Sequence, residues 1–250
     1  MARKPGPGIC VHCLKEVPKR NWDHVFPQGW YPDTTPENLE KWKIPTCKRC
    51  NDEYGRIEED LGIMLSACIN PETAQASGIW KKTLRALDPS YGKNEKDKRA
   101  RERKKRKLLK LMRRGDEIPD HGIYPGLGER WGRPRNEQVA LPVPAKHLQK
   151  LAEKIVKGLA FIEDGQLVDA NTGIEYHVAN EEGAQPIVEA LEKFGKGHSR
   201  GPGIEVIRAV TPDDGVSGFY KITVWGELVM YVTVLRKTVN RKHGSDPSTF

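Results

Sequence analysis

The sequence predicts an α+β protein, and three observations carry this prediction. Two Cys-x-x-Cys pairs enclose a short strand-like segment within the first 50 residues. A run of Lys and Arg, rich in helix formers and free of Gly and Pro, fills 93–114. Helical periodicity over 145–161 is followed by β-branched runs near the end of the chain. We therefore expect a small N-terminal domain built around the cysteines, a basic helical arm, and a C-terminal α+β domain with an antiparallel sheet.

Length and composition favour a folded protein that stays inside the cell. The chain has 250 residues, of which 37% are hydrophobic, enough for one large or two modest domains. No stretch approaches the roughly 20 consecutive apolar residues that cross a bilayer. The first residues lack the apolar segment of a secretory signal. We expect a cytoplasmic protein without membrane contact.

Most of the net charge lies in one segment. The whole chain carries a formal net charge of +8. Residues 93–114 hold 13 Lys or Arg against three acidic residues, a net +10, so the rest of the chain is at −2. Basic segments bind phosphate groups and release counterions, so we expect direct contact with nucleic acid. A solvated helix is the alternative.

The paired cysteines indicate a metal site. Cys10, Cys13, Cys47 and Cys50 form two Cys-x-x-Cys pairs, a spacing at which one tight turn aims two thiolates at the same ion. Because thiols stay reduced in the cytoplasm, a disulfide framework is the weaker interpretation. We predict a structural Zn²⁺ bound by all four thiolates. His12, inside the first pair, is expected to be exposed.

Closure of this zinc site would bring together residues that lie far apart in the sequence. The 33 residues between the pairs become a compact loop, which contains Asp23 and His24 in "NWDHVFPQGW". Asn51 follows Cys50 directly and should open a helix over "NDEYGRIEEDLG". The zinc would therefore carry Asn51 toward the strand that bears His24.

These residues resemble the HNH endonuclease family. The order Asp-His, proline, Asn38, Cys-x-x-Cys and Asn51 in "WDHVFPQGW…PENLEKWKIPTCKRCNDEYG" is similar to that family's motif over roughly residues 8–62. The resemblance implies a ββα-metal fold, with Asp-His on a strand and the last motif residue on a helix. Many members have two Cys-x-x-Cys zinc knuckles in the same places. The last motif position is Asn51 here, where other members have His.

The resemblance also implies roles for the motif residues. Asp23 and the amide oxygen of Asn51 would hold one divalent cation, Mg²⁺ or Mn²⁺, since such cations prefer oxygen ligands. His24 would be the general base toward water, because an imidazole with a pKa near 6.5 suits that task. Asn38 would steady the loop or the His24 ring. The implied activity is hydrolysis of phosphodiester bonds, with double-stranded DNA as the favoured substrate.

Other interpretations stay open for several of these residues. Asp23 and His24 would be plain surface residues if the fold were a zinc-finger module that binds nucleic acid without cutting it. Asn38 would be part of a turn or helix start after Thr35-Pro36. Glu58, two turns into the predicted helix, is expected to be a solvated carboxylate.

The rest of the chain divides by composition. The nuclease-like domain is placed at 1–62, a helical region ending in the basic arm at 63–114, a Gly- and Pro-rich linker at 115–144, and a C-terminal domain at 145–240. Within the last, helices are expected over 145–161 and 184–197, and hairpin turns at Asp164-Gly165 and Gly226-Glu227. Its role is open between homo-oligomer contact and a regulatory partner.

Overall fold

The structure, a computed structural model, describes residues 4–119 and 134–236. Its N-terminal part consists of two short antiparallel strand pairs and a long helix. The pairs are β1 (Gly8–Ile9) with β2 (Glu16–Val17) and β3 (Asn21–His24) with β4 (Lys43–Thr46), and the helix is α1 (Lys48–Ser66). A 3₁₀ turn, η1 (Gln28–Trp30), lies in the connection between β3 and β4. The elements β3, β4 and α1 thus follow one another in the order ββα.

The start of α1 is fixed by a cysteine. Cys47 lies between β4 and α1 with an extended backbone, and its side chain accepts a hydrogen bond from the backbone N–H of Cys50. This is the position and bonding pattern of an N-cap, which satisfies one of the free N–H groups of the first turn. The same residue therefore caps the helix and supplies a thiol at its end.

The basic segment is helical over most of its length, as predicted. Helix α2 (Ile79–Leu87), the turn η2 (Pro89–Tyr91) and helix α3 (Glu95–Leu111) follow α1. Asn94 caps α3, because its side chain accepts a hydrogen bond from the backbone N–H of Asp97.

Short elements occupy the predicted linker where it is described. Strands β5 (Arg113–Arg114) and β6 (Val139–Ala140) pair, and the 3₁₀ turns η3 (Gly115–Glu117) and η4 (Arg135–Glu137) lie beside them. The middle of the predicted linker, 120–133, lies outside the described residues.

The C-terminal part is α+β, with the antiparallel sheet that the sequence predicts. Helix α4 (Ala145–Asp164) precedes a sheet with the strand order β7-β11-β10-β9-β8, in which every neighbouring pair is antiparallel. The strands are β7 (Thr172–His177), β8 (Lys196–Ser199), β9 (Ile204–Val210), β10 (Gly218–Val224) and β11 (Leu228–Arg236), and helix α5 (Gln185–Phe194) connects β7 to β8. The predicted turn at Gly226-Glu227 is confirmed, because Val224 pairs with Leu228 across it.

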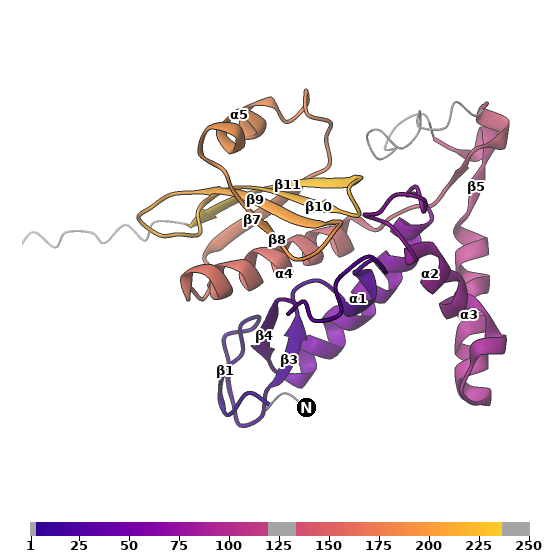
Figure 1. Cartoon of the computed structure of the whole chain (residues 1–250), viewed down its shortest axis with the longest axis horizontal. Helices are drawn as coiled ribbons and strands as arrows, with labels where there is room; N and C mark the ends of the chain where they lie inside the picture. Colours follow the sequence, from indigo (N-terminus) through magenta and orange to yellow (C-terminus); the bar gives the residue numbers. More distant parts are fainter. Residues whose placement is uncertain (1–3, 120–133, 237–250) are drawn as a thin grey trace, which may run out of the picture.

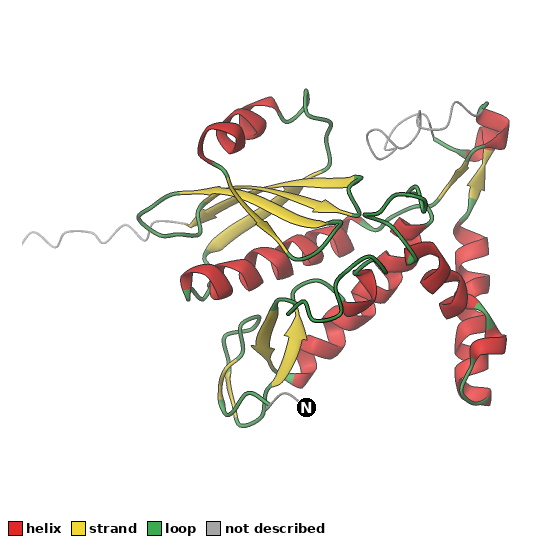
Figure 2. Ribbon diagram, in the orientation of Figure 1, coloured by secondary structure: helices red, strands yellow, loops and turns green. Residues whose placement is uncertain are grey.

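The elements stack in layers (Figure 1). Helix α5 lies on one face of the sheet and α4 on the other, and α1 packs against the far side of α4. Helix α3 stands to one side of this stack, next to α2 (Figure 2). Helix α4 is therefore the layer between the C-terminal sheet and the N-terminal ββα unit.

One hydrophobic core extends through these layers. Val25, which follows β3, belongs to the same buried cluster as Leu151 and Ile155 of α4. Trp225, in the turn after β10, packs on Trp30 with 5.2 Å between ring centroids, and its indole N–H donates to the Trp30 carbonyl at 2.7 Å. The N-terminal unit and the sheet are thus joined by shared packing, through α4 and through this tryptophan pair.

The predicted hairpin turn at Asp164-Gly165 is wrong. Helix α4 continues through Asp164, and Gly165 ends it in the left-handed conformation with a φ of 64°. The backbone N–H of Gly165 donates to the carbonyl of Phe161, which satisfies one of the free carbonyls of the last turn. Gly suits a hairpin turn and a helix C-cap equally well, and the apolar face of α4 against the sheet decided between them.

The contact between α4 and Val25, the residue after β3, gives a stability prediction. Gly158 lies where α4 passes the N-terminal unit, and a Cβ there would lie 2.6 Å from Cγ2 of Val25. Gly158→Ala should lower the free energy of unfolding by about 1–3 kcal/mol, because a β-branched neighbour cannot yield cheaply. Gly55→Ala in α1 is the control, since a Cβ there meets nothing within 4 Å and should stabilise the helix by up to about 1 kcal/mol. Urea unfolding measures the free energy of unfolding of both variants. Equal effects of the two substitutions would contradict the close approach of α4 to Val25.

Candidate metal centre and buried charge network

Four cysteines, two from the β1–β2 hairpin and two from the junction of β4 with α1, converge. The Sγ atoms of Cys10, Cys13, Cys47 and Cys50 all lie within 4.8 Å of one another, and those of Cys13 and Cys47 are 3.9 Å apart. Zn–S bonds of about 2.3 Å in a tetrahedron place the sulfur atoms about 3.8 Å apart, so the donor set fits Zn²⁺. The structure thus supports a possible structural zinc site at the predicted cysteines.

Local backbone geometry aims these thiols inward. In the first knuckle, Leu14 adopts a positive φ of 58° and its N–H donates to the Cys10 carbonyl at 2.9 Å, which closes a tight turn. The backbone N–H of Cys47 donates to Cys10 Sγ at 3.2 Å, and that of Cys50 donates to Cys47 Sγ at 3.5 Å. Hydrogen bonds of this kind stabilise thiolates, as a metal site requires.

The carboxylate of Asp23 points into the protein. Asp23 lies on β3 with an exposed fraction of 7%, and Oδ2 accepts a hydrogen bond from Nε2 of His12 at 3.2 Å. The His12 ring packs on Tyr54 of α1, with 4.4 Å between the ring centroids. His12 was expected to be exposed, but that prediction is wrong, because the turn between the first two cysteines folds its ring under α1.

A lysine of α4 completes this cluster. Lys154 has an exposed fraction of 0%, and its Nζ lies 3.0 Å from Oδ1 of Asp23. The same ammonium forms an ion pair with Glu58 of α1 and lies 5.6 Å from the centre of the Tyr54 ring. Glu58 is therefore buried, and the prediction of a solvated carboxylate is wrong. This buried cation bridges two carboxylates that come from different elements.

The environment shifts the pKa values of these groups in different directions. Burial opposes ionisation of Asp23, but the hydrogen bond from His12 and the charge of Lys154 outweigh it and lower the Asp23 pKa. For Glu58, burial outweighs the attraction of Lys154 and raises the pKa to about 7. Burial also lowers the pKa of His12, although Asp23 acts in the opposite sense. Asp23 is thus the more strongly ionised partner of Lys154.

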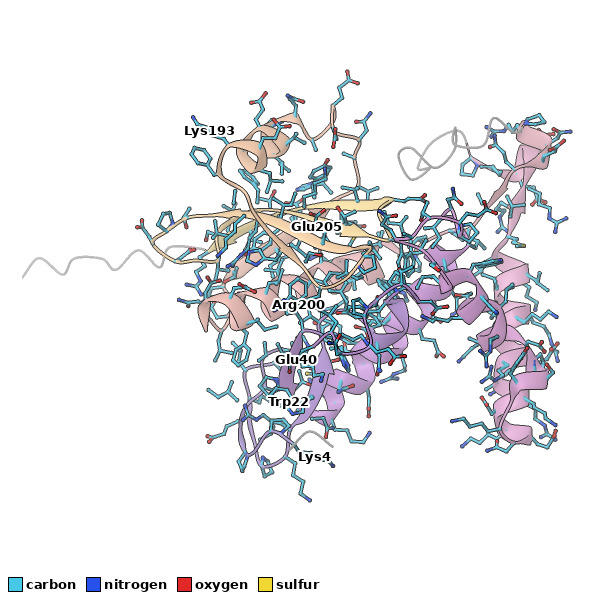
Figure 3. The ribbon with its side chains drawn as sticks, in the orientation of Figure 1. Lys4, Trp22, Glu40, Lys193, Arg200 and Glu205 are labelled. Atoms are coloured by element: carbon cyan, nitrogen blue, oxygen red, sulfur yellow. The ribbon has the colours of Figure 1, made fainter. Side chains whose placement is uncertain are left out.

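His24 lies on the opposite face of β3. Successive side chains of a strand point to opposite sides, so His24 and Trp22 share the face that Asp23 does not. Trp22 is 41% exposed, and Figure 3 labels it in the N-terminal unit. The cross-strand partner of His24 is Lys43. Burial and the charge of Lys43 lower the His24 pKa, so its imidazole is neutral near pH 7.

Asn51 and Asn38 lie in different surroundings. Asn51 is partly buried in the second turn of α1, three and seven residues before Tyr54 and Glu58, so it shares the helix face that lines the Asp23 cluster. Asn38 is exposed, in a turn closed by the Leu39 N–H donating to the Pro36 carbonyl at 3.1 Å.

The structure gathers the predicted site residues only in part. Among the described residues, no hydrogen bond or ion pair joins Asp23, His24 and Asn51 to one another. Instead, Asp23 is joined to His12, which the sequence analysis expected at the surface, and to Lys154, which it did not single out. The sequence spacing could have indicated that Lys154 is buried, because it lies three residues after Leu151 and four before Gly158, on the apolar face of the helix. A lysine on such a face needs a buried partner.

Comparisons with known proteins add no relative. A scan against protein-family models and searches of curated proteins and of solved structures find no match for this chain. Among the described residues, no helix has the length and apolar character to span a membrane.

The cysteine cluster predicts one zinc ion per chain. Cys47→Ser removes a thiolate but keeps a side chain that can cap α1, so zinc content should fall to near zero and the protein should lose much of its stability, as structural zinc contributes to folding. Cys68→Ser is the matched control. Because Cys68 lies outside the cluster, this variant should keep its zinc. Elemental analysis of purified protein measures the content. A zinc-free wild-type protein with unchanged unfolding after treatment with a chelator would contradict the site.

The buried lysine gives a second prediction for this site. Lys154→Met leaves Asp23 and Glu58 without their cation and should lower the free energy of unfolding by about 3–5 kcal/mol, because an unpaired buried charge is costly. Lys150→Met on the same helix is the control: its pair with Glu153 is partly exposed, so the change should stay within about 0.5 kcal/mol. Urea unfolding at pH 7 compares them, and a loss under about 1 kcal/mol for Lys154→Met would contradict the network.

Proposed function

We propose that this protein is an HNH-type endonuclease that hydrolyses phosphodiester bonds in DNA. The observation that supports it best is an antiparallel pair followed by a helix, with four converging cysteines at the junction. Asp23 and His24 lie on the first strand of that unit, and Asn51 lies near the start of its helix. These are the positions in which the family's motif residues are expected.

His24 would act as the general base. Its lowered pKa leaves the imidazole neutral near pH 7, which is the form that can accept a proton from water. Among the described residues, its ring has no hydrogen-bond partner. A nitrogen of the ring is therefore available to a water molecule next to a phosphate. Lys43 lies across the strand pair from His24, and its charge would attract that phosphate.

The proposal includes a divalent cation, Mg²⁺ or Mn²⁺, with Asp23 and Asn51 as ligands. When bound, such an ion supplies Lewis-acid stabilisation of a phosphate oxygen. The arrangement around Asp23 does not fit this ion as it stands, because one carboxylate oxygen accepts from His12 and the other contacts Lys154. We therefore assign no step of the reaction to the ion, and cation binding at Asp23 would require Lys154 to leave.

The same contacts favour a second candidate function. A zinc-stabilised module that binds nucleic acid without cutting it would need Asp23 only as the buried partner of Lys154. The observation that supports this binding module is the full burial of Lys154 between two carboxylates. Cytoplasmic location, and a homo-oligomer or regulatory contact through 145–240, stay predictions from the sequence.

A cleavage assay separates the two functions. Supercoiled plasmid is incubated with the protein and Mg²⁺ or Mn²⁺, and nicked and linear products are followed over time. His24→Ala should lower the cleavage rate by about 10²- to 10⁴-fold, the usual contribution of a general base. His177→Ala is the control. Because His177 lies on β7 in the C-terminal sheet, this variant should cut the plasmid at the wild-type rate.

The binding measurement completes this test. Plasmid binding by His24→Ala should stay close to that of the wild type, because the fold and the zinc site do not depend on this ring. DNA binding by the wild type with no metal-dependent cutting would reject the nuclease and support the binding module.

A further inference from the structure

We propose that the outer face of α3, formed by Arg99, Arg103, Arg106 and Lys110, binds the phosphate backbone of double-stranded nucleic acid without reading its sequence. This inference rests on the part of the proposed function that names nucleic acid as the partner. It does not depend on hydrolysis. It assigns the contact to one side of one helix, where the sequence alone indicated only a basic segment.

The inner side of α3 is used for packing. Leu108 is buried, and Arg101 donates to the carbonyl of Arg85 at the end of α2. Lys104 and Lys107 form ion pairs with Glu59 and Asp60, which lie next to each other on α1. These cations neutralise an acidic surface of the protein itself. Burial of Leu108, with these pairs beside it, orients α3 about its axis and so sets the direction in which the remaining cations point.

The outer face lies opposite this packed side. At about 100° per residue, Arg99, Arg103, Arg106 and Lys110 fall within an arc of about 60° that lies away from Leu108. All four are exposed. Among the described residues, only Arg106 has an ion pair, with Glu102 at 3.1 Å between Nε and Oε1.

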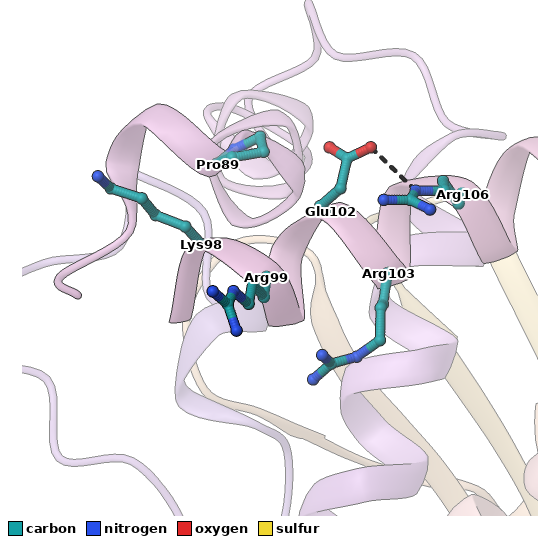
Figure 4. A pocket seen from close by; sticks show the side chains of 6 residues that line it. All are labelled: Pro89, Lys98, Arg99, Glu102, Arg103 and Arg106. Carbon is teal, nitrogen blue, oxygen red and sulfur yellow. Dashed lines mark hydrogen bonds and ion pairs between the residues drawn. The ribbon is translucent and has the colours of Figure 1, made fainter. Parts of the chain in front are cut away.

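Two hollows follow this face along the helix. The first is lined by Pro89, Lys98, Arg99, Glu102, Arg103 and Arg106 (Figure 4), and the second by Arg103, Arg106, Lys107, Lys110 and Leu111. Arg103 and Arg106 line both. Glu102 is the one acidic residue in either lining, so the face offers two shallow, mainly cationic hollows.

Like charges on this face repel one another. Arg99 and Arg103 are four residues apart, Arg103 and Arg106 three, and Arg106 and Lys110 four, which are the spacings at which like charges destabilise a helix. A polyanion that lies along the face relieves this repulsion, and the counterions that it releases add to the affinity. Charge complementarity therefore selects a chain of phosphates as the partner.

The geometry favours a duplex over a single strand. The four cations extend over 12 residues, about 16 Å of helix, which matches about five phosphates along one strand of B-DNA. Cations at fixed spacing on a rigid helix suit a backbone whose own spacing is fixed. Single-strand sites use aromatic side chains on which bases stack, and α3 contains no aromatic residue.

The salt dependence of binding tests this inference. Affinity for a short random-sequence DNA duplex is measured by fluorescence anisotropy between about 50 and 200 mM salt, without added divalent cations. The triple variant Arg99→Gln, Arg103→Gln, Arg106→Gln should reduce the slope of log K against log salt by about 2.7, at 0.9 per phosphate contact. Near 0.1 M salt, its affinity should fall on the order of 100-fold. Gln keeps the helix propensity, and far-UV circular dichroism checks the fold.

A matched pair on the same helix separates position from net charge. Arg103→Gln should weaken binding, whereas Lys105→Gln should not, because the exposed Lys105 side chain leaves α3 about 160° from Arg103. Equal losses for the two, or wild-type binding by the triple variant, would overturn the inference. If the triple variant lost binding to an acidic polypeptide but bound DNA as the wild type does, the inference would be overturned in favour of a protein partner. A wild type that binds as described yet never cuts would reject the nuclease and leave this inference standing.

Discussion

The buried ammonium of Lys154 is the interaction on which the arrangement of this protein depends. It reaches from α4 into the N-terminal unit and contacts one carboxylate on β3 and another on α1. A charge without water around it is stable only when such partners surround it, so α4 must dock with this orientation and register. Because α4 also carries the C-terminal sheet on its other side, the position of the whole C-terminal part follows from this contact.

Two constraints of different kinds thus shape the N-terminal unit. The four cysteines join the β1–β2 hairpin to the junction of β4 with α1, as a local clasp within one short stretch of sequence. The charge network instead joins residues more than 90 positions apart, since Glu58 and Lys154 meet across the packed helices. Asp23 belongs to both settings: its strand lies between the two cysteine pairs, and its oxygens are held by His12 and Lys154. The two candidate functions differ in the role of Asp23: the nuclease needs it as a ligand of a divalent cation, and the binding module needs it only as the buried partner of Lys154.

Several elements could be predicted because their signals are local. The cysteine spacing, the helix formers of the basic segment and the β-branched runs around Gly226 each report on a few neighbouring residues. The predictions that were wrong concern residues whose surroundings come from distant parts of the chain. His12 and Glu58 are polar residues whose burial depends on partners that fold onto them from elsewhere in the chain. The Asp164-Gly165 turn failed for a related reason, since a Gly with positive φ suits both a hairpin and a helix end, and only the packing of α4 distinguishes them.

The sequence by itself determined the cysteine clasp, the order of strands and helix around it, and the concentration of positive charge between residues 93 and 114. These depend on spacing and composition, which folding does not alter. Tertiary structure alone decided that Asp23 faces Lys154 while His24 faces outward, and which of the many cations on α3 pair with the protein itself. The physical reason is the same in both cases: the free energy of a charged side chain depends on which opposite charges and how much water surround it, and packing sets both.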